Sequence, residues 1–217
     1  VDLQKTLKLI EEAYQVVREA TENGEHVLFV GTKKQARDVI RREAERCEQF
    51  HVTERWLGGM LTNFQTIRQS IRRLDALDKM TTDGTHERLK KKEVLQLERE
   101  RAKLLRALSG IRNMGKLPGL MVVVDTKKEQ IVIGEASRLE IPIVAIVDTN
   151  CNPDEIEYPI PGNDDAIRSI TLITRVISDA VLEGMKAKSE VAEGRSDDGG
   201  RVPEVVVGEE ITEITES

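Results

Sequence analysis

Three short, uninterrupted apolar runs constrain the fold of this chain more than any other feature. Residues 27–30, 120–124 and 143–147 read VLFV, LMVVV and IVAIV. Runs of this length without polar alternation are typical of strands buried on both faces, as in parallel sheets. Helical patterns lie between them along the chain. Alternating strands and helices predict parallel βαβ units with right-handed crossovers.

Weaker signals complete the sheet and its helices. Residues 51–56 and 156–160 predict two further strands, giving five. Helices are expected over residues 2–23, over 127–139, and after Asn163, which is a good N-cap. The fold class is therefore predicted as α/β, a three-layer sandwich around a five-stranded parallel sheet.

Two details of the helices follow from local chemistry. Thr32 and Gln35 have the spacing of a capping box, which predicts a helix that begins at Thr32. The last helix is expected to bury one apolar stripe that includes Ile167, Ile170 and Ile173.

Residues 63–113 break the strand–helix rhythm. Apolar residues recur at steps of three and four in two arms, interrupted by Arg101 in the second arm, and Thr81 to Gly84 supply a turn. This pattern predicts an antiparallel helical hairpin, a coiled coil that projects from the domain. The expected organisation is an α/β domain of residues 1–62 and 114–187, an inserted hairpin of residues 63–113, and a tail of residues 188–217.

Charge is segregated along the chain, whose formal net charge is -6. The tail has 9 acidic and 3 basic residues, and its poor patterning predicts disorder. Residues 64–116 instead have 14 basic and 7 acidic residues, a net charge of +7. Such an excess permits local contact with phosphate although the whole chain is acidic. Aromatic residues make up only 3%, so RNA would be recognised through shape and phosphates rather than by base stacking.

A second candidate phosphate contact follows the first strand. Gly31, Thr32, Lys33 and Lys34 lie where a strand ends and a helix begins, and free N–H groups at such a place can bind anions. The spacing of a nucleotide-binding P-loop is absent. Single contacts to a phosphate backbone and a merely capped helix with two solvated lysines both remain open.

The rival function is that of an enzyme or a receiver-like regulator. Asp125 and Asp148 each end a predicted strand, and paired carboxylates at one sheet edge can hold Mg²⁺. Aspartates also cap turns at such positions, which favours a structural role. No nucleophile–base pair accompanies them, and the spacing of His26, His51 and His86 does not suggest a zinc site. We therefore expect no catalytic residue, no metal and no cofactor.

Cellular setting can also be inferred from composition. Cys47 and Cys151 are far apart and form no CxxC motif, which indicates a reduced cytoplasmic environment. No apolar run approaches the ~20 residues that cross a bilayer, so no membrane partner is expected.

Four ordered segments resemble one family, the second protein of the bacterial small ribosomal subunit. They are VLFVGTKKQA from residue 27, RWLGGMLTNF from residue 55, IPIVAIVDTN from residue 141 and PIPGNDDAIRSI from residue 159. The resemblance implies a flavodoxin-like parallel sheet, no catalysis, no small-molecule substrate, and a ribosome-bound, cytoplasmic bacterial protein. It implies binding to small-subunit ribosomal RNA and to other small-subunit proteins, including the large first protein that recruits messenger RNA. It also implies an N-terminal segment that is missing here.

The candidate RNA-binding residues come from two sources. The resemblance implies positions in the strand-end loop and in the segment before the hairpin: Thr32, Lys33, Lys34, Arg55, Trp56, Gly58, Gly59, Thr62 and Asn63. Charge adds positions in the hairpin: Arg68, Arg72, Arg73, Lys90, Lys91 and Lys92. A third reading, a free-standing module that binds a protein through the hairpin, stays open.

Overall fold

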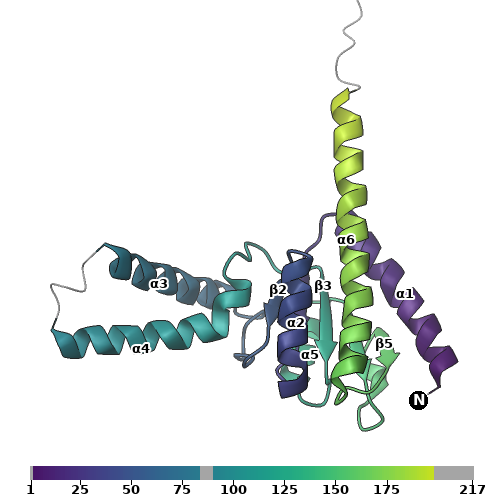
Figure 1. The fold of residues 1–217 in the computed structure, drawn as a ribbon, viewed down its shortest axis with the longest axis horizontal. Helices are drawn as coiled ribbons and strands as arrows, with labels where there is room; N and C mark the ends of the chain where they lie inside the picture. Colours follow the sequence, from purple (N-terminus) through teal and green to yellow (C-terminus); the bar gives the residue numbers. More distant parts are fainter. Residues whose placement is uncertain (1, 84–89, 198–217) are drawn as a thin grey trace, which may run out of the picture.

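A five-stranded, all-parallel sheet forms the centre of the protein, as expected from the sequence. The computed structural model describes residues 2–83 and 90–197. The strands are β1 (Val27–Val30), β2 (Phe50–Val52), β3 (Leu120–Val124), β4 (Ile143–Val147) and β5 (Tyr158–Pro161), in the order β2-β1-β3-β4-β5 (Figure 1). Phe29 of β1 is in register with His51 of β2 on one side and with Val122 of β3 on the other.

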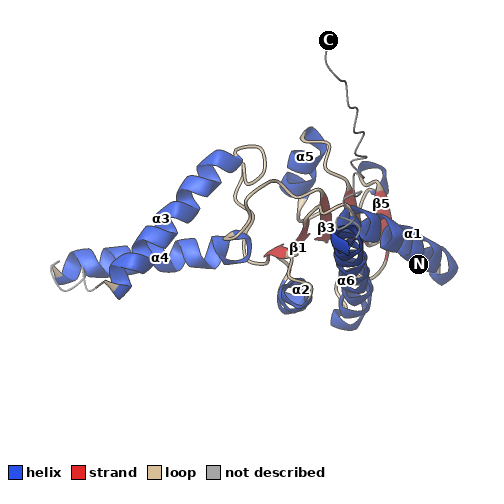
Figure 2. Cartoon of the chain, turned by 90° about the horizontal axis from the view of Figure 1, so that it is seen from above, coloured by secondary structure: helices blue, strands red, loops and turns tan. Residues whose placement is uncertain are grey.

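Helices cover both faces of the sheet (Figure 2). One face packs against α1 (Leu3–Glu22), α2 (Lys34–Arg46) and α6 (Ile167–Asp197), and the other against α5 (Gln130–Arg138). Successive strand residues contribute to opposite cores: Phe29 packs with the first set of helices, whereas Leu28 packs with the second. This two-sided burial explains why the strands read as continuous apolar runs.

Two helices project away from the sheet. The chain leaves the body along α3 (Phe64–Thr82) and returns along α4 (Lys91–Leu108) into a short 3-10 turn, Ser109–Ile111 (Figure 1). We call α3 and α4 the arm. Ion pairs join its helices: Arg73 binds Glu100 through two hydrogen bonds of 2.9 and 3.0 Å, and Arg101 pairs with Asp78. Arg101, which interrupts the apolar pattern, is thus accommodated by a carboxylate of the opposite helix.

The structure corrects several local predictions. Strand β2 ends at Val52 rather than at residue 56. Helix α2 begins at Lys34 with Lys33 as its N-cap, without a side-chain hydrogen bond, because the Thr32 hydroxyl donates instead to Glu129. Ile167 is 57% exposed because it is the first residue of α6 and precedes the buried stripe.

The boundary of the acidic tail also differs from the expectation. Helix α6 continues to Asp197, so the start of the predicted disordered segment is helical. Residues 198–217 lie outside the described residues, as does Gly84 of the predicted turn. Among the described helices, none is long and apolar enough to cross a membrane.

The long helix α6 packs closely on α1 at a buried glycine. A Cβ atom at Gly184 would lie 2.0 Å from Thr21 Oγ1 and 2.4 Å from the Arg18 carbonyl oxygen, so a side chain there forces the helices apart. At Gly134, on the exposed face of α5, nothing lies within 4 Å of such an atom. An alanine at Gly184 therefore tests the packing of α6 on α1, whereas an alanine at Gly134 tests only the helix propensity of the residue.

We predict that Gly184→Ala lowers the free energy of unfolding by about 1–3 kcal/mol through overpacking. Gly134→Ala should raise it by about 0.5–1 kcal/mol, because alanine loses less backbone entropy in a helix. Chemical denaturation of both variants measures the difference. Equal effects would contradict the tight α1–α6 contact.

Candidate nucleic-acid interface

The segment before the arm is organised around one buried carboxylate, Glu135 of α5. Its Oε1 accepts hydrogen bonds from Trp56 Nε1 (3.0 Å) and the Gly59 amide (2.7 Å). Its Oε2 accepts from the Leu61 amide (2.9 Å), the Thr62 amide (3.1 Å) and the Thr62 hydroxyl (3.2 Å). Gly59 adopts φ +87°, a conformation that favours glycine, and this directs its amide toward the carboxylate.

The hydrogen bonds also determine the ionisation of Glu135. Burial opposes the charged form, but the donors from Trp56, Leu61, Thr62 and Gly59 outweigh it and hold the pKa below its ordinary value. Trp56 is only 7% exposed and its ring packs in the core. Trp56, Gly59 and Thr62 therefore shape the segment, and the indole is not free to stack on a base.

A second buried carboxylate holds the loop after β1. Glu129 Oε1 accepts from both the amide (3.1 Å) and the hydroxyl (2.5 Å) of Thr32. Here burial is the dominant effect and raises the pKa of Glu129 despite these bonds. The Thr32 carbonyl in turn accepts from Arg37 Nε at 3.0 Å, so the same loop positions a guanidinium. Thr32 itself is 6% exposed and turned inward.

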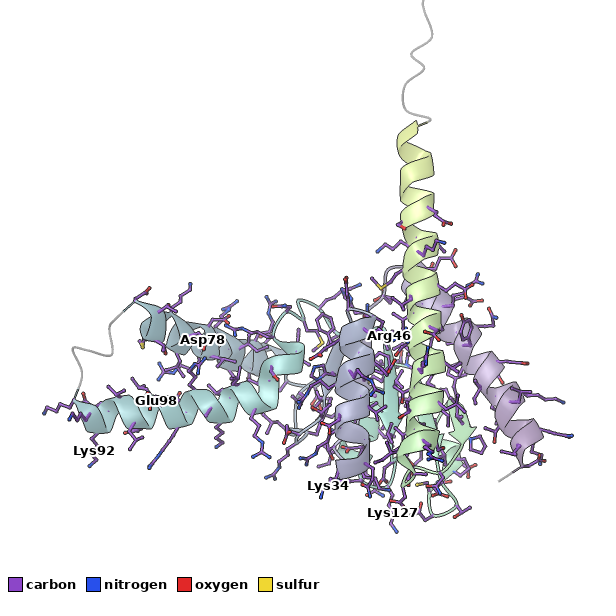
Figure 3. All side chains as sticks on the ribbon, viewed as in Figure 1. Lys34, Arg46, Asp78, Lys92, Glu98 and Lys127 are labelled. Atoms are coloured by element: carbon purple, nitrogen blue, oxygen red, sulfur yellow. The ribbon has the colours of Figure 1, made fainter. Side chains whose placement is uncertain are left out.

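The two lysines after Thr32 have opposite environments. Lys34 is exposed at the first turn of α2 (Figure 3). Lys33 points instead into a cluster of acids, with Nζ at 2.6 Å from Asp165, 2.7 Å from Asp164 and 3.3 Å from Asp125. Burial alone would lower the pKa of Lys33, but the hydrogen bonds to Asp164 and Asp165 raise it above its ordinary value. This lysine is an internal counterion.

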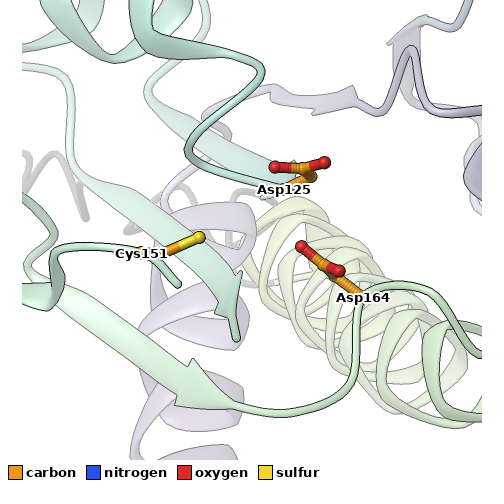
Figure 4. A group of neighbouring side chains, drawn as sticks. All are labelled: Asp125, Cys151 and Asp164. Carbon is orange, nitrogen blue, oxygen red and sulfur yellow. The ribbon is translucent and has the colours of Figure 1, made fainter. Parts of the chain in front are cut away.

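The predicted metal pair does not form as a pair. Among the described residues, Asp125 groups with Cys151 and Asp164 (Figure 4). Asp148 groups instead with Asp164 and Asp165, and the ligand atoms of each group lie within 4.8 Å of one another. These atoms could coordinate a divalent cation, but the Lys33 ammonium already lies against three of the carboxylates. Asp125 Oδ1 also accepts from the Lys128 amide at 3.1 Å, the structural role expected of a strand-end aspartate.

The basic residues of the arm differ in their exposure and pairing. Arg68 is exposed and donates to the Gly115 carbonyl oxygen at 3.4 Å, and Arg72 is exposed as well. Arg73 is engaged by Glu100. The other predicted arm positions, Lys90, Lys91 and Lys92, are exposed at the start of α4. Figure 3 shows Lys92 at the far end of the arm.

The remaining predicted positions border the arm on the body side. Arg55, Gly58 and Asn63 are exposed, and Asn63 Oδ1 accepts from the Thr66 hydroxyl at 2.8 Å at the start of α3. Arg55 and Gly58 are thus exposed to solvent, whereas neighbouring residues of the same segment donate hydrogen bonds to the buried Glu135.

Sequence reasoning did not single out Glu135, Glu129 or Glu54. Glu54 Oε2 accepts from Arg106 Nε (2.9 Å) and Arg37 Nη1 (3.3 Å), and so connects α4 to α2. Acidic residues are normally solvated, and neither their spacing nor their neighbours mark these three as buried or paired. The only available signal was the Gly-Gly pair at positions 58 and 59, because a glycine can adopt the positive φ that turns a backbone amide toward a buried acceptor, as Gly59 does.

Together these contacts define an architectural class of protein. Asp125 at the end of β3 is engaged in an ion pair with Lys33, and basic side chains are exposed on the projecting helices. The family profile of Ribosomal protein S2 matches residues 1–184. The chain therefore belongs to the ribosomal protein S2 family, a family of structural components rather than enzymes, as the sequence predicted.

Similar proteins agree with this assignment. The chain is 57% identical over 189 residues, 87% of its length and 74% of the relative's, to small ribosomal subunit protein uS2 of Geotalea uraniireducens (strain Rf4). It is 54% identical over 220 aligned residues, 100% of its length and 76% of the relative's, to small ribosomal subunit protein uS2 of Treponema pallidum (strain Nichols).

We predict that Glu135→Gln destabilises the protein by at least about 2 kcal/mol at pH 7, because the amide nitrogen would face backbone donors. Unfolding can be followed by the fluorescence of Trp56, the single tryptophan. Because the folded-state pKa of Glu135 is depressed, its stabilisation is present above the unfolded pKa. The deficit of the variant should shrink as the pH falls through the folded pKa.

Glu129→Gln is the matched control. A glutamine carbonyl can keep both bonds from Thr32, since they reach a single oxygen, so this variant should lose much less stability. A smaller loss in Glu135→Gln than in Glu129→Gln would refute the central role of Glu135.

Proposed function

We propose that this protein is a structural constituent of the small ribosomal subunit, cytoplasmic and ribosome-bound, which binds small-subunit ribosomal RNA and neighbouring ribosomal proteins. The observation that carries the proposal is the exposed basic surface of the arm, within a segment of net charge +7. Lysine and arginine gain affinity for RNA by releasing the counterions condensed on phosphates. Membership of a ribosomal protein family favours RNA as the partner of this surface.

Exposed residues are the proposed RNA contacts, whereas residues held by an acid of the protein itself position them. The contacts are Lys34, Arg55, Gly58, Asn63, Arg68, Arg72, Lys90, Lys91 and Lys92. The positioning residues are Thr32, Lys33, Trp56, Gly59, Thr62 and Arg73, since each has a partner inside the protein. We also infer a partner in the large first protein of the subunit, which recruits messenger RNA.

The finer fold assignment is part of the same proposal. We assign the body to the flavodoxin-like three-layer sandwiches, whose doubly wound strand order is that of β2-β1-β3-β4-β5. We assign the arm as an antiparallel coiled coil, supported by the burial of Ile67, Ile71 and Leu74 along α3 and by the ion pairs between its helices.

Gradient sedimentation of a cell lysate tests the proposal. Most of the protein is expected to travel with small subunits, and with isolated subunits when magnesium is lowered. Recovery chiefly at the top of the gradient would sink the ribosomal assignment. Under the enzyme alternative, Asp148→Asn would abolish a metal-dependent activity in that soluble pool while the fold stayed intact.

The arm makes a sharper prediction. Arg68→Glu with Arg72→Glu should reduce the fraction incorporated into small subunits severalfold, because repulsion replaces attraction to phosphate. The same charge change on α1, Lys5→Glu with Lys8→Glu, serves as the control, since both lysines are exposed and α1 lies on the side of the body away from the arm (Figure 1). Equal incorporation of both double variants would show that the α3 arginines are merely solvated.

A further inference from the structure

A hollow of about 650 Å³ lies where the arm joins the body, between α2, the loop after β2 and α4. Arg37, Arg55, Lys103 and Arg106 line it together with a single acid, Glu54. Leu57, Ala102 and Ala107 complete the lining. We call this hollow the α4 groove. Its four cations come from three separate segments that only the tertiary fold brings together.

The groove continues in both directions. A neighbouring hollow shares Arg37, Glu54 and Arg55 with it and extends toward Lys128. Another shares Glu54 and Arg106 and extends toward Arg41. Three adjoining hollows therefore carry basic side chains on both sides of Glu54, with Glu129 and Glu45 as further acids in the two extensions.

Glu54 holds three guanidinium groups side by side. Its oxygens lie 2.8 Å from Arg106, 3.3 Å from Arg37 and 3.7 Å from Arg41. Hydrogen bonding to Arg106, and the charges of the other arginines, keep the pKa of Glu54 below its ordinary value. One carboxylate cannot neutralise three arginines, so the cluster keeps an excess positive charge at fixed positions.

Two further cations of the groove, Arg55 and Lys103, are available to a ligand. Within the described part of the chain, neither Arg55 nor Lys103 forms an ion pair, and both are exposed. Other bases differ: Arg73 and Arg101 of the arm, and Arg112 just after it, are engaged by acids of the arm. The α4 groove therefore combines free and pre-oriented cations in one depression.

We propose that the α4 groove binds consecutive phosphates of an RNA backbone. This inference rests on the proposed function and names the place of contact. Orientated guanidinium groups suit phosphate, which they can bind through two parallel hydrogen bonds. A row of cations matches the closely and regularly spaced charges of a nucleic-acid strand better than the scattered carboxylates of an acidic protein. Trp56, beside the groove, is buried and cannot stack on a base, so the expected contact is with the RNA backbone.

The test uses Arg55→Glu combined with Lys103→Glu in the full chain, because neither residue pairs with Glu54. Binding to a transcript of the small-subunit ribosomal RNA is measured by filter retention over a series of salt concentrations. We expect an affinity loss of at least about tenfold at ~0.1 M salt, and a salt slope smaller by about 2 for two lost phosphate contacts. Lys5→Glu with Lys8→Glu, of identical charge change, should keep the slope of the unmodified chain. Trp56 fluorescence and thermal midpoints verify that each variant is folded.

The outcomes distinguish failure of the groove as the contact site from failure of RNA binding in general. If the unmodified chain binds the transcript and the groove variant binds it with equal affinity and slope, the groove is not the contact, although the proposed function stands. An equal loss in the α1 control would overturn the groove as well, because the effect would then reflect overall charge. A groove variant that keeps RNA but loses binding to polyglutamate would assign the groove to an acidic protein partner instead. Failure of the unmodified chain to bind the transcript would defeat RNA binding itself.

Discussion

The arrangement of the candidate interface depends on the hydrogen bonding of one carboxylate, Glu135. Three backbone amides, an indole and a hydroxyl donate to its two oxygens from the segment that precedes the arm. A buried charge is costly unless it is fully hydrogen-bonded, and here the loop supplies the donors. The same bonds fix a segment that has no regular secondary structure. The direction in which α3 leaves the body follows from this anchor.

Ion pairs with acidic residues of the protein itself limit which lysines and arginines remain available to a partner. Arg73 and Arg101 bind carboxylates of the opposite arm helix, which keeps α3 and α4 together, and Arg112, just after the arm, binds Asp75 of α3. Lys33, in the loop after β1, is held in the same way by Asp125, which follows β3, and by Asp164 and Asp165, which precede α6. The excess charge of the segment is therefore concentrated on fewer side chains than composition indicates, and much of it borders the junction of arm and body.

Much of the fold could be predicted because its signals are local. The runs beginning at Val27, Leu120 and Ile143 were correctly predicted as strands, since burial on both faces requires continuous apolar sequence. The candidate site was predicted less well. Thr32 was interpreted as a helix cap, but its hydroxyl is used by Glu129, which lies 97 residues further along the chain. A local motif competes with distant partners that no spacing rule can anticipate.

The sequence alone determined the number of strands, their parallel direction, the presence of two helices between β2 and β3, and the segregation of charge. These properties depend on periodicity and composition, which are read within short windows. Only the tertiary structure decided that Glu135, Glu129 and Glu54 are acceptors, and that Arg37, Arg55 and Arg106 line one groove. The physical reason is that hydrogen bonds and ion pairs act over a few ångströms in space, irrespective of separation along the chain, so their partners exist only once the sheet has brought the helices together.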